Sequence, residues 1–569
     1  MLVLGLDVRP EHQRPDPFGG VVEADRGAAE TLAPIVAAPG GYVSFHLVAK
    51  LDTPGTYEVN AKSGLSIDVF REWYHLTAAG HKLIPDALIP VSLPLRSTMP
   101  DPENRISKQT AQAFWIDVWV PPGTAPGAYN VTTTMRAGSE TVTKSVEIRV
   151  IAARVPADDV VTMDHNSYGT SFLVEQYPKL AARHGGDAFI TSDAFFHLIH
   201  AYHRIFYEHR GVMHQLGYGH GGKVAPEFAP ALSGSGRAKK IASWDLYDRH
   251  YGPLLDGSAF RDTRRGARPI PFVYLPVNPE WPASFLWWGE PGYEAEFVNV
   301  VSAMERHFRE KGWTATRFEL FFNHKKRYKA FPWDGDEVRF LGDDRYFKEY
   351  ARLMAKAVPA STPVKFAFRT DTSWAMEQQF QDLAGVINFW VCSGGIASWN
   401  RDSLRRVVER GDIAWYYGGP PEITKPSTEI TELGLRAWLW GIHGFVHWLT
   451  VSAGPDPWFN FDGGGTALVY PGERFGIEGP LASIRLKIQR NALQDLALAG
   501  NSKAEVAHRF NGSSLPDWWS ERPPLANRPP EEWTNNDIDD ATKPAEARLR
   551  KADAASWQRV RDFVMEKAR

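Results

Sequence analysis

DDRYFKEYARLMAKAVPASTPVKFAFRTDTSW, residues 343–374, joins a helical pattern to a short apolar run that ends in polar side chains. In its first half one stripe at helical spacing is apolar and the opposite side is charged; the stripe consists of Phe347, Tyr350, Leu353 and Met354. The second half is apolar from Val364 to Phe368, apart from Lys365, and then reaches the polar pair Arg369 and Asp371. This stretch therefore predicts an amphipathic helix followed by a buried strand.

Units of this kind recur from about residue 156 to residue 500. Eight apolar runs that end in polar or aromatic clusters alternate with helical stretches, and they begin at Val160, Gly211, Pro269, Arg317, Val364, Val386, Ile413 and Gly444. Eight such units predict a (β/α)8 barrel. Because barrel enzymes carry their chemistry on the loops after the strands, the candidate site residues are those at the C-terminal strand ends.

The two ends of the chain have other patterns. Before the barrel, alternating and β-branched segments such as QAFWIDVWVPP (from Gln112) are separated by Pro, Gly and Asp turns, which predicts an antiparallel β-sandwich. After residue 500 a segment rich in Pro, Asn and Trp predicts an irregular extension packed on the barrel, which ends in a helix. We expect a sandwich domain at 1–155, a catalytic barrel domain at 156–500 and a C-terminal extension at 501–569.

Composition narrows the class of partner. The formal net charge is −3, with 64 Lys and Arg against 67 Asp and Glu, so the basic footprint of a nucleic-acid binder is missing. A neutral small molecule or a glycan is the more natural partner. Many of the 21 Trp fall in predicted loops, where an indole can stack on a sugar ring, although each could equally fill the core.

The cysteine count and the apolar runs indicate what to expect of disulfides and of membrane spans. The single Cys392 excludes an intrachain disulfide, and we favour a small buried side chain over a pocket thiol. No signal peptide is visible in this chain, and no apolar run reaches the ~18 residues of a membrane span, so we expect a soluble protein without a membrane span. The compartment and the oligomeric state stay open.

In this order of domains, several stretches resemble glycoside hydrolase family 123, formerly an uncharacterised barrel domain family. They include NRISKQTAQAFWIDVWVPPGTAPGAYNVTTTM (from Asn104), YYGGPP in the seventh barrel unit and LGLRAWLWGIHGFVHWLTV (from Leu433). The most specific is YPGERFGIEGPLASIRLKIQRNALQDLALA (from Tyr470), with a Tyr-Pro-Gly turn and then Gly-Pro-x-x-Ser-x-Arg. The similar stretches cover most of residues 40–500.

The resemblance implies a retaining N-acetylgalactosaminidase in which the 2-acetamido group of the substrate attacks the anomeric carbon. An adjacent Asp-Glu pair after the fourth strand would then orient the acetamido group and act as general acid/base. In this chain the fourth strand ends in Asn323, His324 and Lys325, and the nearest pair is Asp336 and Glu337 in the insertion KAFPWDGDEVRF (from Lys329). Either the loop supplies the acids a few residues late, or the site is rebuilt.

We take Asp336 and Glu337 as the candidate catalytic residues, with Glu337 as a general acid of raised pKa and Asp336 ionised. The absence of a carboxylate at the seventh strand end favours substrate assistance. The pair could instead be a solvated loop tip, and a hydrolase of different stereochemistry could use Asp371 with Glu337. A non-catalytic carbohydrate-binding or structural protein on a hydrolase scaffold is the alternative from another class.

Residues at strand ends and in loops are the candidates for substrate binding. Among them Arg369 and Asp371 could be a buried ion pair or a sugar clamp, and Trp288 and Trp458 should line the substrate groove. We also expect Asn166, His214, Asn278, Asn323, Arg369 and Tyr417 to converge on one pocket. The full set is Asp164, Asn166, His214, Trp288, Asn323, His324, Arg369, Asp371, Tyr416, Tyr417, Trp448 and Trp458.

Three strand-end histidines with carboxylates nearby also permit a zinc site, since both side chains are zinc ligands. The histidines are His165, His214 and His324. The chain has neither a close HxH nor an HExxH motif, and phosphate-loop and dinucleotide fingerprints are missing as well. We therefore expect no metal and no cofactor.

Overall fold

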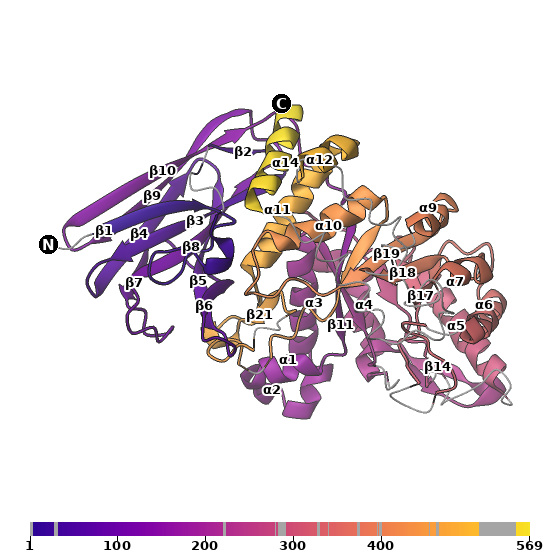
Figure 1. Ribbon diagram of the computed structural model, residues 1–569. Helices are drawn as coiled ribbons and strands as arrows, with labels where there is room; N and C mark the ends of the chain where they lie inside the picture. Colours follow the sequence, from indigo (N-terminus) through magenta and orange to yellow (C-terminus); the bar gives the residue numbers. More distant parts are fainter. Residues whose placement is uncertain are drawn as a thin grey trace.

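The computed structural model describes residues 4–27, 32, 34–219, 224–278, 280–282, 292–326, 331–338, 341–372, 376–394, 397, 401–454, 456–462, 466–510 and 553–569. In Figure 1 the N-terminal strands form one body, the barrel forms a second, and the C-terminal helix lies at the junction between them.

The N-terminal part is a sandwich of two five-stranded sheets. The first has the order β1-β3-β8-β5-β6, with strands Leu4–Pro10, Gly41–Leu51, Ala111–Val120, Ser66–Leu76 and Leu83–Pro90. The second has the order β2-β10-β9-β4-β7, with strands Ile35–Ala37, Glu140–Val150, Gly127–Ala137, Gly55–Ser63 and Leu95–Met99. Neighbouring strands are antiparallel except β2 and β10, which run parallel. The predicted β-sandwich is confirmed.

Strand β8 shows how the sandwich meets the barrel. Its alternation turns Phe114, Ile116 and Val118 into the sandwich core. The opposite face would be solvated in an isolated sheet, yet Trp115 and Asp117 on that face are also buried. Trp115 packs in a cluster with side chains of the barrel part, so the second face of this sheet is covered by the barrel.

All eight predicted barrel strands occur in one parallel sheet of order β12-β11-β20-β19-β18-β17-β16-β15. Its two edges, β12 and β15, lie side by side, with no ladder between them among the described residues. The prediction of a barrel after a sandwich is confirmed. In chain order the strands span Thr162–Tyr168 (β11), Gly211–Leu216 (β12), Phe272–Tyr274 (β15), Arg317–Leu320 (β16), Lys365–Thr372 (β17), Phe389–Ser393 (β18), Ile413–Gly418 (β19) and Gly444–His447 (β20).

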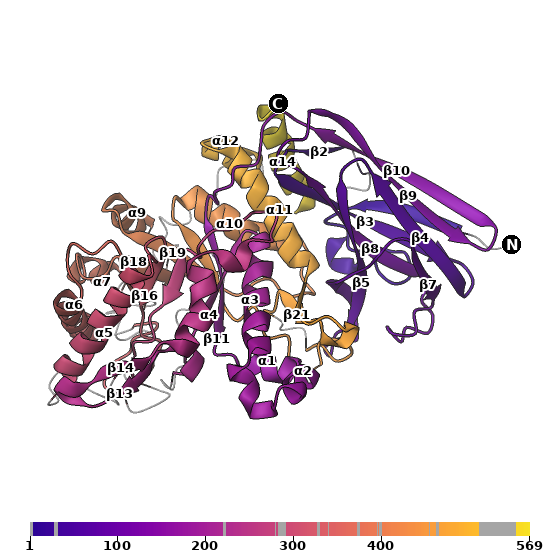
Figure 2. The ribbon, with the colours of Figure 1, turned by 180° about the vertical axis from the view of Figure 1, so that it is seen from behind.

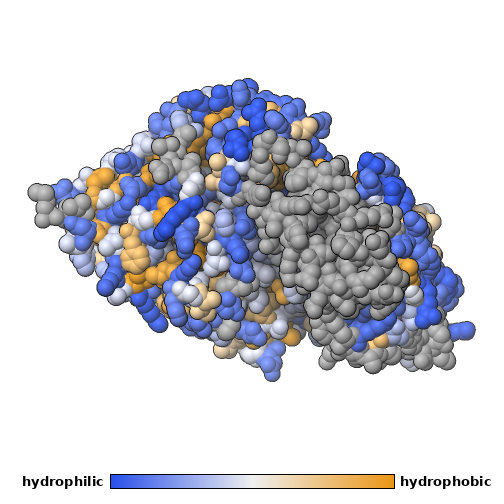
Figure 3. Space-filling view, viewed as in Figure 1, coloured by the Kyte–Doolittle hydropathy of each residue, from blue (hydrophilic) through white to orange (hydrophobic). Residues whose placement is uncertain are grey.

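Helices surround this sheet in both ribbon views (Figures 1 and 2). Where they face solvent their surface is mainly hydrophilic, as at the right edge of Figure 3. No described helix is long and apolar enough to cross a membrane. They span Ser171–Gln176 (α1), Pro178–Arg183 (α2), Asp193–Glu208 (α3), Asp245–Leu255 (α4), Tyr293–Glu310 (α5), Asp344–Ala357 (α6), Met376–Asp382 (α7), Arg401–Glu409 (α9), Glu429–Trp440 (α10), Ile484–Ala499 (α11), Lys503–Arg509 (α12) and Ala554–Lys567 (α14).

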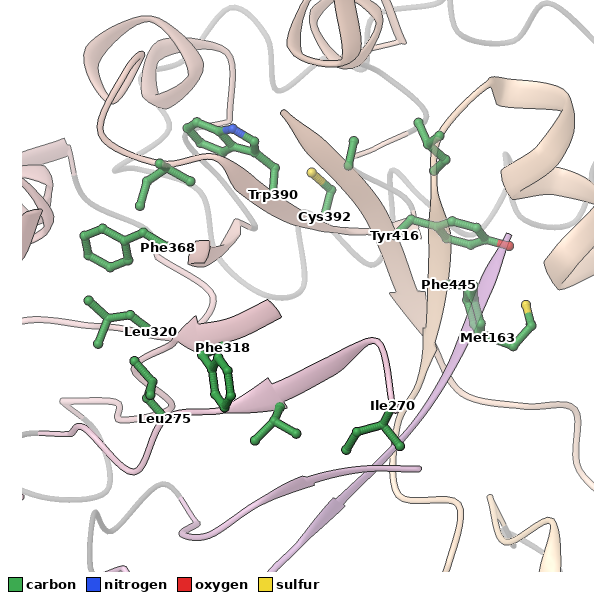
Figure 4. Close-up of a cluster of buried hydrophobic side chains, with 14 of the residues drawn as sticks. Met163, Ile270, Leu275, Phe318, Leu320, Phe368, Trp390, Cys392, Tyr416 and Phe445 are labelled. Atoms are coloured by element: carbon green, nitrogen blue, oxygen red, sulfur yellow. The ribbon is translucent and has the colours of Figure 1, made fainter. Parts of the chain in front are cut away.

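An apolar layer separates the strands from the helices, and Figure 4 shows part of it. Every second strand residue contributes, for example Phe318 and Leu320 of β16 and Tyr416 of β19. Cys392 of β18 lies in the same layer, fully buried, and burial raises the pKa of its thiol to about 12. This is the small buried side chain that we favoured over a pocket thiol.

Helix α11 joins the two bodies and is buried along almost its whole length, including its charged residues. Arg485 donates to Asp86 of β6 at 2.8 Å, and Arg490 donates to Asp117 of β8 at 2.8 Å. Lys487 also binds Asp117. The predicted C-terminal helix is α14, which packs against α11 and α12. Most of the predicted irregular extension, 511–552, lies outside the described residues.

Candidate functional site

The barrel mouth is formed by the C-terminal ends of the parallel strands. Side chains on a strand alternate between the barrel interior and the helix layer, so only every second polar residue can reach the mouth. On β17 the side chains of Arg369 and Asp371 point into the barrel interior. On β16 the side chain of Glu319 does so, and the odd-numbered residues that follow it lie on the same side of the chain towards the mouth. The same rule selects Asp164 on β11 and His214 on β12.

These interior side chains form one buried polar network. The Arg369 guanidinium donates to both oxygens of Asp371, at 2.8 and 3.1 Å, and to Glu319 at 3.3 Å. His214 lies between two carboxylates, with Nδ1 bound to Asp164 and Nε2 3.1 Å from Glu319. Arg369 and Asp371 are thus a buried ion pair that belongs to a larger chain of charges.

Tyr274 of β15 ties this network together. Its ring stacks on the His214 imidazole with centroids 3.8 Å apart, and its hydroxyl accepts from Arg369 at 2.7 Å. Asn166 Nδ2 donates to the same hydroxyl at 3.4 Å. The sequence reasoning missed Tyr274 and Glu319, because it considered only strand ends. Extending the period-two pattern back from Asn323 would have selected Glu319.

Burial and neighbouring charges set the ionisation of the network. Burial disfavours a charge on His214, but Glu319 and Asp164 outweigh it and raise the pKa of His214 to about 9. Burial raises the pKa of Asp371 despite the contact with Arg369, and it raises the pKa of Asp164 despite His214. The interior therefore holds two cations, His214 and Arg369, beneath the mouth.

The loop after β16 folds back over the mouth. The backbone N–H groups of Gly335 and Asp336 donate to the His324 carbonyl at 3.0 and 3.3 Å, and Val338 N–H donates to the Asp371 carbonyl at 3.1 Å. A Cβ at Gly335 would lie 2.5 Å from the Phe322 Cβ, so only glycine fits this turn. Glu337 has a φ of 47°, in the left-handed region. The loop thus brings both candidate acids to the ends of β16 and β17.

Lys325 and Tyr417 hold the acid pair. Lys325 Nζ lies 3.1 Å from Asp336 Oδ2 and also contacts Glu337. Tyr417 of β19 donates to Glu337 Oε1 at 2.8 Å. The side chain of Glu337 is 28% exposed and that of Asp336 is 10% exposed, so Glu337 is the more accessible acid. Burial disfavours the Lys325 charge, but the two carboxylates outweigh it and raise its pKa.

Two further candidates, Trp448 and Asn323, lie at or below the rim. Trp448 follows β20, is 47% exposed and donates from its indole to the Tyr168 hydroxyl at 3.1 Å. Burial first, and then the carboxylates of Asp336 and Asp371, raise the pKa of the Tyr168 phenol. Asn323 is buried, and its backbone N–H donates to the Tyr218 hydroxyl at 2.9 Å.

Other candidates lie away from the mouth. The His324 ring is buried against Trp333 and Phe331, because its position on the strand faces the helix layer. Tyr416 faces α10 for the same reason and donates to the Leu433 carbonyl at 2.8 Å. Both side chains face the helix layer and not the barrel mouth, so we do not propose either as a substrate ligand. The sequence analysis included them because it used only the position at a strand end, which does not show to which face a side chain points.

Asn278 does not join the pocket that we expected, since its side chain closes a local turn by accepting from Glu280 N–H at 2.7 Å. Trp458 packs where the sandwich meets the barrel, with centroids 5.6 Å from Trp73 and 5.2 Å from Phe475. Trp288 lies outside the described residues. No group of three or more His, Cys, Asp or Glu side chains in the described part of the chain could hold a metal ion.

Comparison with solved structures shows the fold. The chain is similar to a family 123 glycoside hydrolase from Clostridium perfringens, with 14% identity and a TM-score of 0.67 over 100% of this chain and 99% of that one. It therefore has the fold that the sequence resemblance implied.

Two other solved structures are much less similar to the chain, with TM-scores below 0.3. One is to a Bacteroides uniformis beta-glucuronidase (11% identity, 76% of this chain and 47% of that one, TM-score 0.28). The other is to a putative alpha-galactosidase from Bacteroides fragilis (11% identity, 81% of this chain and 76% of that one, TM-score 0.26). No family model matches the chain, and no curated relative was found.

Proposed function

We propose that this protein is a glycoside hydrolase that cleaves N-acetylhexosaminides, such as N-acetylgalactosaminides, with retention and by substrate assistance. The observation that carries the proposal is the adjacent pair Asp336 and Glu337, which the loop after β16 folds over the barrel mouth. The full-length likeness in fold to a family 123 glycoside hydrolase supports it.

Glu337 serves as the general acid/base because it is the more exposed member of the pair. It transfers its proton to the leaving oxygen as the bond from that oxygen to the anomeric carbon breaks. Asp336 accepts a hydrogen bond from the acetamido N–H, and the acetamido oxygen attacks the anomeric carbon. Water then opens the cyclic intermediate and gives a proton back to Glu337, which yields net retention.

A protein nucleophile is the competing possibility, and the structure disfavours it. Asp371 is a further buried carboxylate at the end of β17, but both of its oxygens accept from the Arg369 guanidinium. The end of β19 offers the Tyr417 hydroxyl and no carboxylate. Because Asp371 is paired with Arg369 and the described end of β19 carries no carboxylate, we propose the acetamido group of the substrate as the nucleophile.

Kinetics with two leaving groups test the proposal. The substrates are 4-nitrophenyl and 2,4-dinitrophenyl glycosides of N-acetylgalactosamine and N-acetylglucosamine. Glu337→Gln should lower kcat/KM on the 4-nitrophenyl glycoside by roughly 10²–10⁴-fold, with a smaller loss on the 2,4-dinitrophenyl glycoside, which needs less protonation. Asp336→Asn should lower turnover of both. Glu310→Gln, an exposed carboxylate on α5, is the matched control.

Three results would contradict the proposal. Wild-type rates in both Glu337→Gln and Asp336→Asn would remove the pair from the mechanism and direct attention to Asp371 and Asp164. Equal turnover of glycosides with and without the 2-acetamido group would exclude substrate assistance. Glycan binding by the wild-type protein without any turnover would favour the non-catalytic carbohydrate-binding alternative.

A further inference from the structure

Lys325 stands where the interior face of β16 reaches the barrel mouth. The odd-numbered residues of this strand point inward: Glu319 accepts from the Arg369 guanidinium at 3.3 Å, and the Phe321 ring centroid lies 4.5 Å from it. The same series continues through Asn323 to Lys325, whose side chain is only 7% exposed. The alternation along the strand therefore places a largely buried lysine at the mouth.

The acid pair folds back onto this lysine. Lys325 Nζ lies 3.1 Å from Asp336 Oδ2 and donates to Oε2 of Glu337, 12 residues further along the chain. One ammonium therefore bridges two adjacent carboxylates. Without a cation, two ionised carboxylates held side by side in a mostly buried position would repel each other.

The described titratable groups that face the pair from the neighbouring strands are phenols and a carboxylate. Tyr417 of β19 donates to Glu337 Oε1 at 2.8 Å. Burial raises the pKa of Asp371 on β17, and the charge of Glu337 adds to this effect, so a third carboxylate acts on the pair. Burial also raises the pKa of two phenols on which the charge of Asp336 acts as well, namely Tyr168 and Tyr218.

Lys325 is the cation that compensates the pair. Arg369, the cation of β17, is already bound to both oxygens of Asp371. Burial disfavours the ammonium of Lys325, but the carboxylates of Asp336 and Glu337 outweigh burial and raise its pKa, so the lysine is charged at neutral pH. The lysine therefore offsets one of the two negative charges that the loop brings to the mouth.

We propose that Lys325 is the positioning residue of the acid pair: its ammonium holds Asp336 and Glu337 together and stabilises the carboxylate that Glu337 becomes when it gives up its proton. This role rests on the proposed function. The proton moves from Glu337 to the leaving oxygen as the bond from that oxygen to the anomeric carbon breaks, and negative charge develops beside the ammonium. Lys325 keeps its own protons throughout. It makes Glu337 a stronger acid and lowers the highest pH at which Glu337 still carries a proton.

Variants of the full-length protein separate charge from shape. Lys325→Met removes the charge at similar length, and Lys325→Gln, which keeps a donor, takes its place if Lys325→Met does not fold. Lys325→Arg keeps the charge. The matched control is Lys356→Met, which removes a lysine that pairs with Glu294 on the surface between α5 and α6.

Urea unfolding from about pH 7.5 to about pH 4.5 tests the lysine without turnover. At the upper end Lys325→Met should have a lower urea midpoint than the wild type, because two ionised carboxylates remain side by side. As the pH falls, the folded variant takes up a proton at a higher pH than the wild type does, so the gap between the midpoints should narrow. The gaps for Lys325→Arg and Lys356→Met should stay constant. A constant gap for Lys325→Met would show a purely structural lysine and overturn the inference.

The pH profile of kcat/KM on the two aryl N-acetylhexosaminides tests the catalytic role. On its acidic plateau Lys325→Met should lose roughly 10–100-fold on the 4-nitrophenyl glycoside, the factor for one hydrogen bond to a charged group, and less on the 2,4-dinitrophenyl glycoside. Its basic limb should move up by about 1–3 pH units, whereas that of Lys325→Arg should stay in place. An unmoved basic limb in an active Lys325→Met would overturn the inference.

The two measurements distinguish this inference from the proposed function. If the urea gap narrows but the wild type cleaves none of the glycosides, the charge role of Lys325 is supported while the proposed hydrolysis fails. In a Glu337→Gln background, Lys325→Met should not move the residual pH profile. A shift of the same size in that background would assign the effect to another group and overturn the inference.

Discussion

His214→Gln would remove the cation that lies between Asp164 and Glu319 in the barrel interior. The two carboxylates raise the pKa of His214 from 6.5 to about 9 against the effect of burial. At about 1.4 kcal/mol for each pH unit, this difference corresponds to about 3 kcal/mol of stability from the imidazolium. The substitution should cost at least that much near pH 6.5, because it also leaves two buried carboxylates without their shared partner.

The stability that His214 contributes should depend on pH in a defined window. Because its pKa is raised in the folded protein, the contribution is fully present below pH 6.5 and is lost as the pH rises through about 9. Several other buried histidines have lowered pKa values, among them His250, at about 3 because of burial. Their effect has the opposite sign and appears only below pH 6.5, so it does not overlap with this window.

Urea denaturation at a series of pH values from about 6.5 to about 9.5 would measure the effect. The free energy of unfolding of the wild type should fall by about 3 kcal/mol more than that of His214→Gln over this range. His250→Gln is the matched control, since it removes a buried neutral imidazole and should give a curve parallel to the wild type. A constant gap between wild type and His214→Gln across the window would refute the charged state assigned to His214.

Three further outcomes follow from the contacts described above. Trp458→Ala should lower the free energy of unfolding by about 3–5 kcal/mol in urea titrations, because the indole packs in the aromatic cluster with Trp73 and Phe475. A loss below about 1 kcal/mol would show that the indole does not contribute to the core. Asp117→Asn should cost about 3–5 kcal/mol by the same measurement, because Lys487 and Arg490 would be left buried without a carboxylate; a neutral effect would contradict this account of the seam. Tyr417→Phe should reduce kcat on aryl glycosides by about tenfold with an unchanged melting temperature, since it removes one hydrogen bond to Glu337; unchanged kinetics would show that this bond does not position the acid.

Local periodicity in the sequence was sufficient for the architecture. All eight barrel strands and the sandwich follow from apolar spacing and turn residues, because these patterns encode which face of an element is apolar. The same alternation, applied consistently, separates Tyr417 at the mouth from Tyr416 in the helix layer. It also explains why His324 is buried next to Trp333 although it stands in the same strand end as Asn323.

Only the tertiary structure decided which distant side chains meet. The placement of Asp336 and Glu337 depends on backbone bonds from their loop to His324 and Asp371, and no local pattern encodes these bonds. Arg490 of α11 is buried against Asp117, 373 residues away in the chain, and no local pattern names that partner. Periodicity reports the preference of one segment for apolar or polar surroundings. The partner that satisfies a buried charge or covers an aromatic ring is set only when separate surfaces pack together.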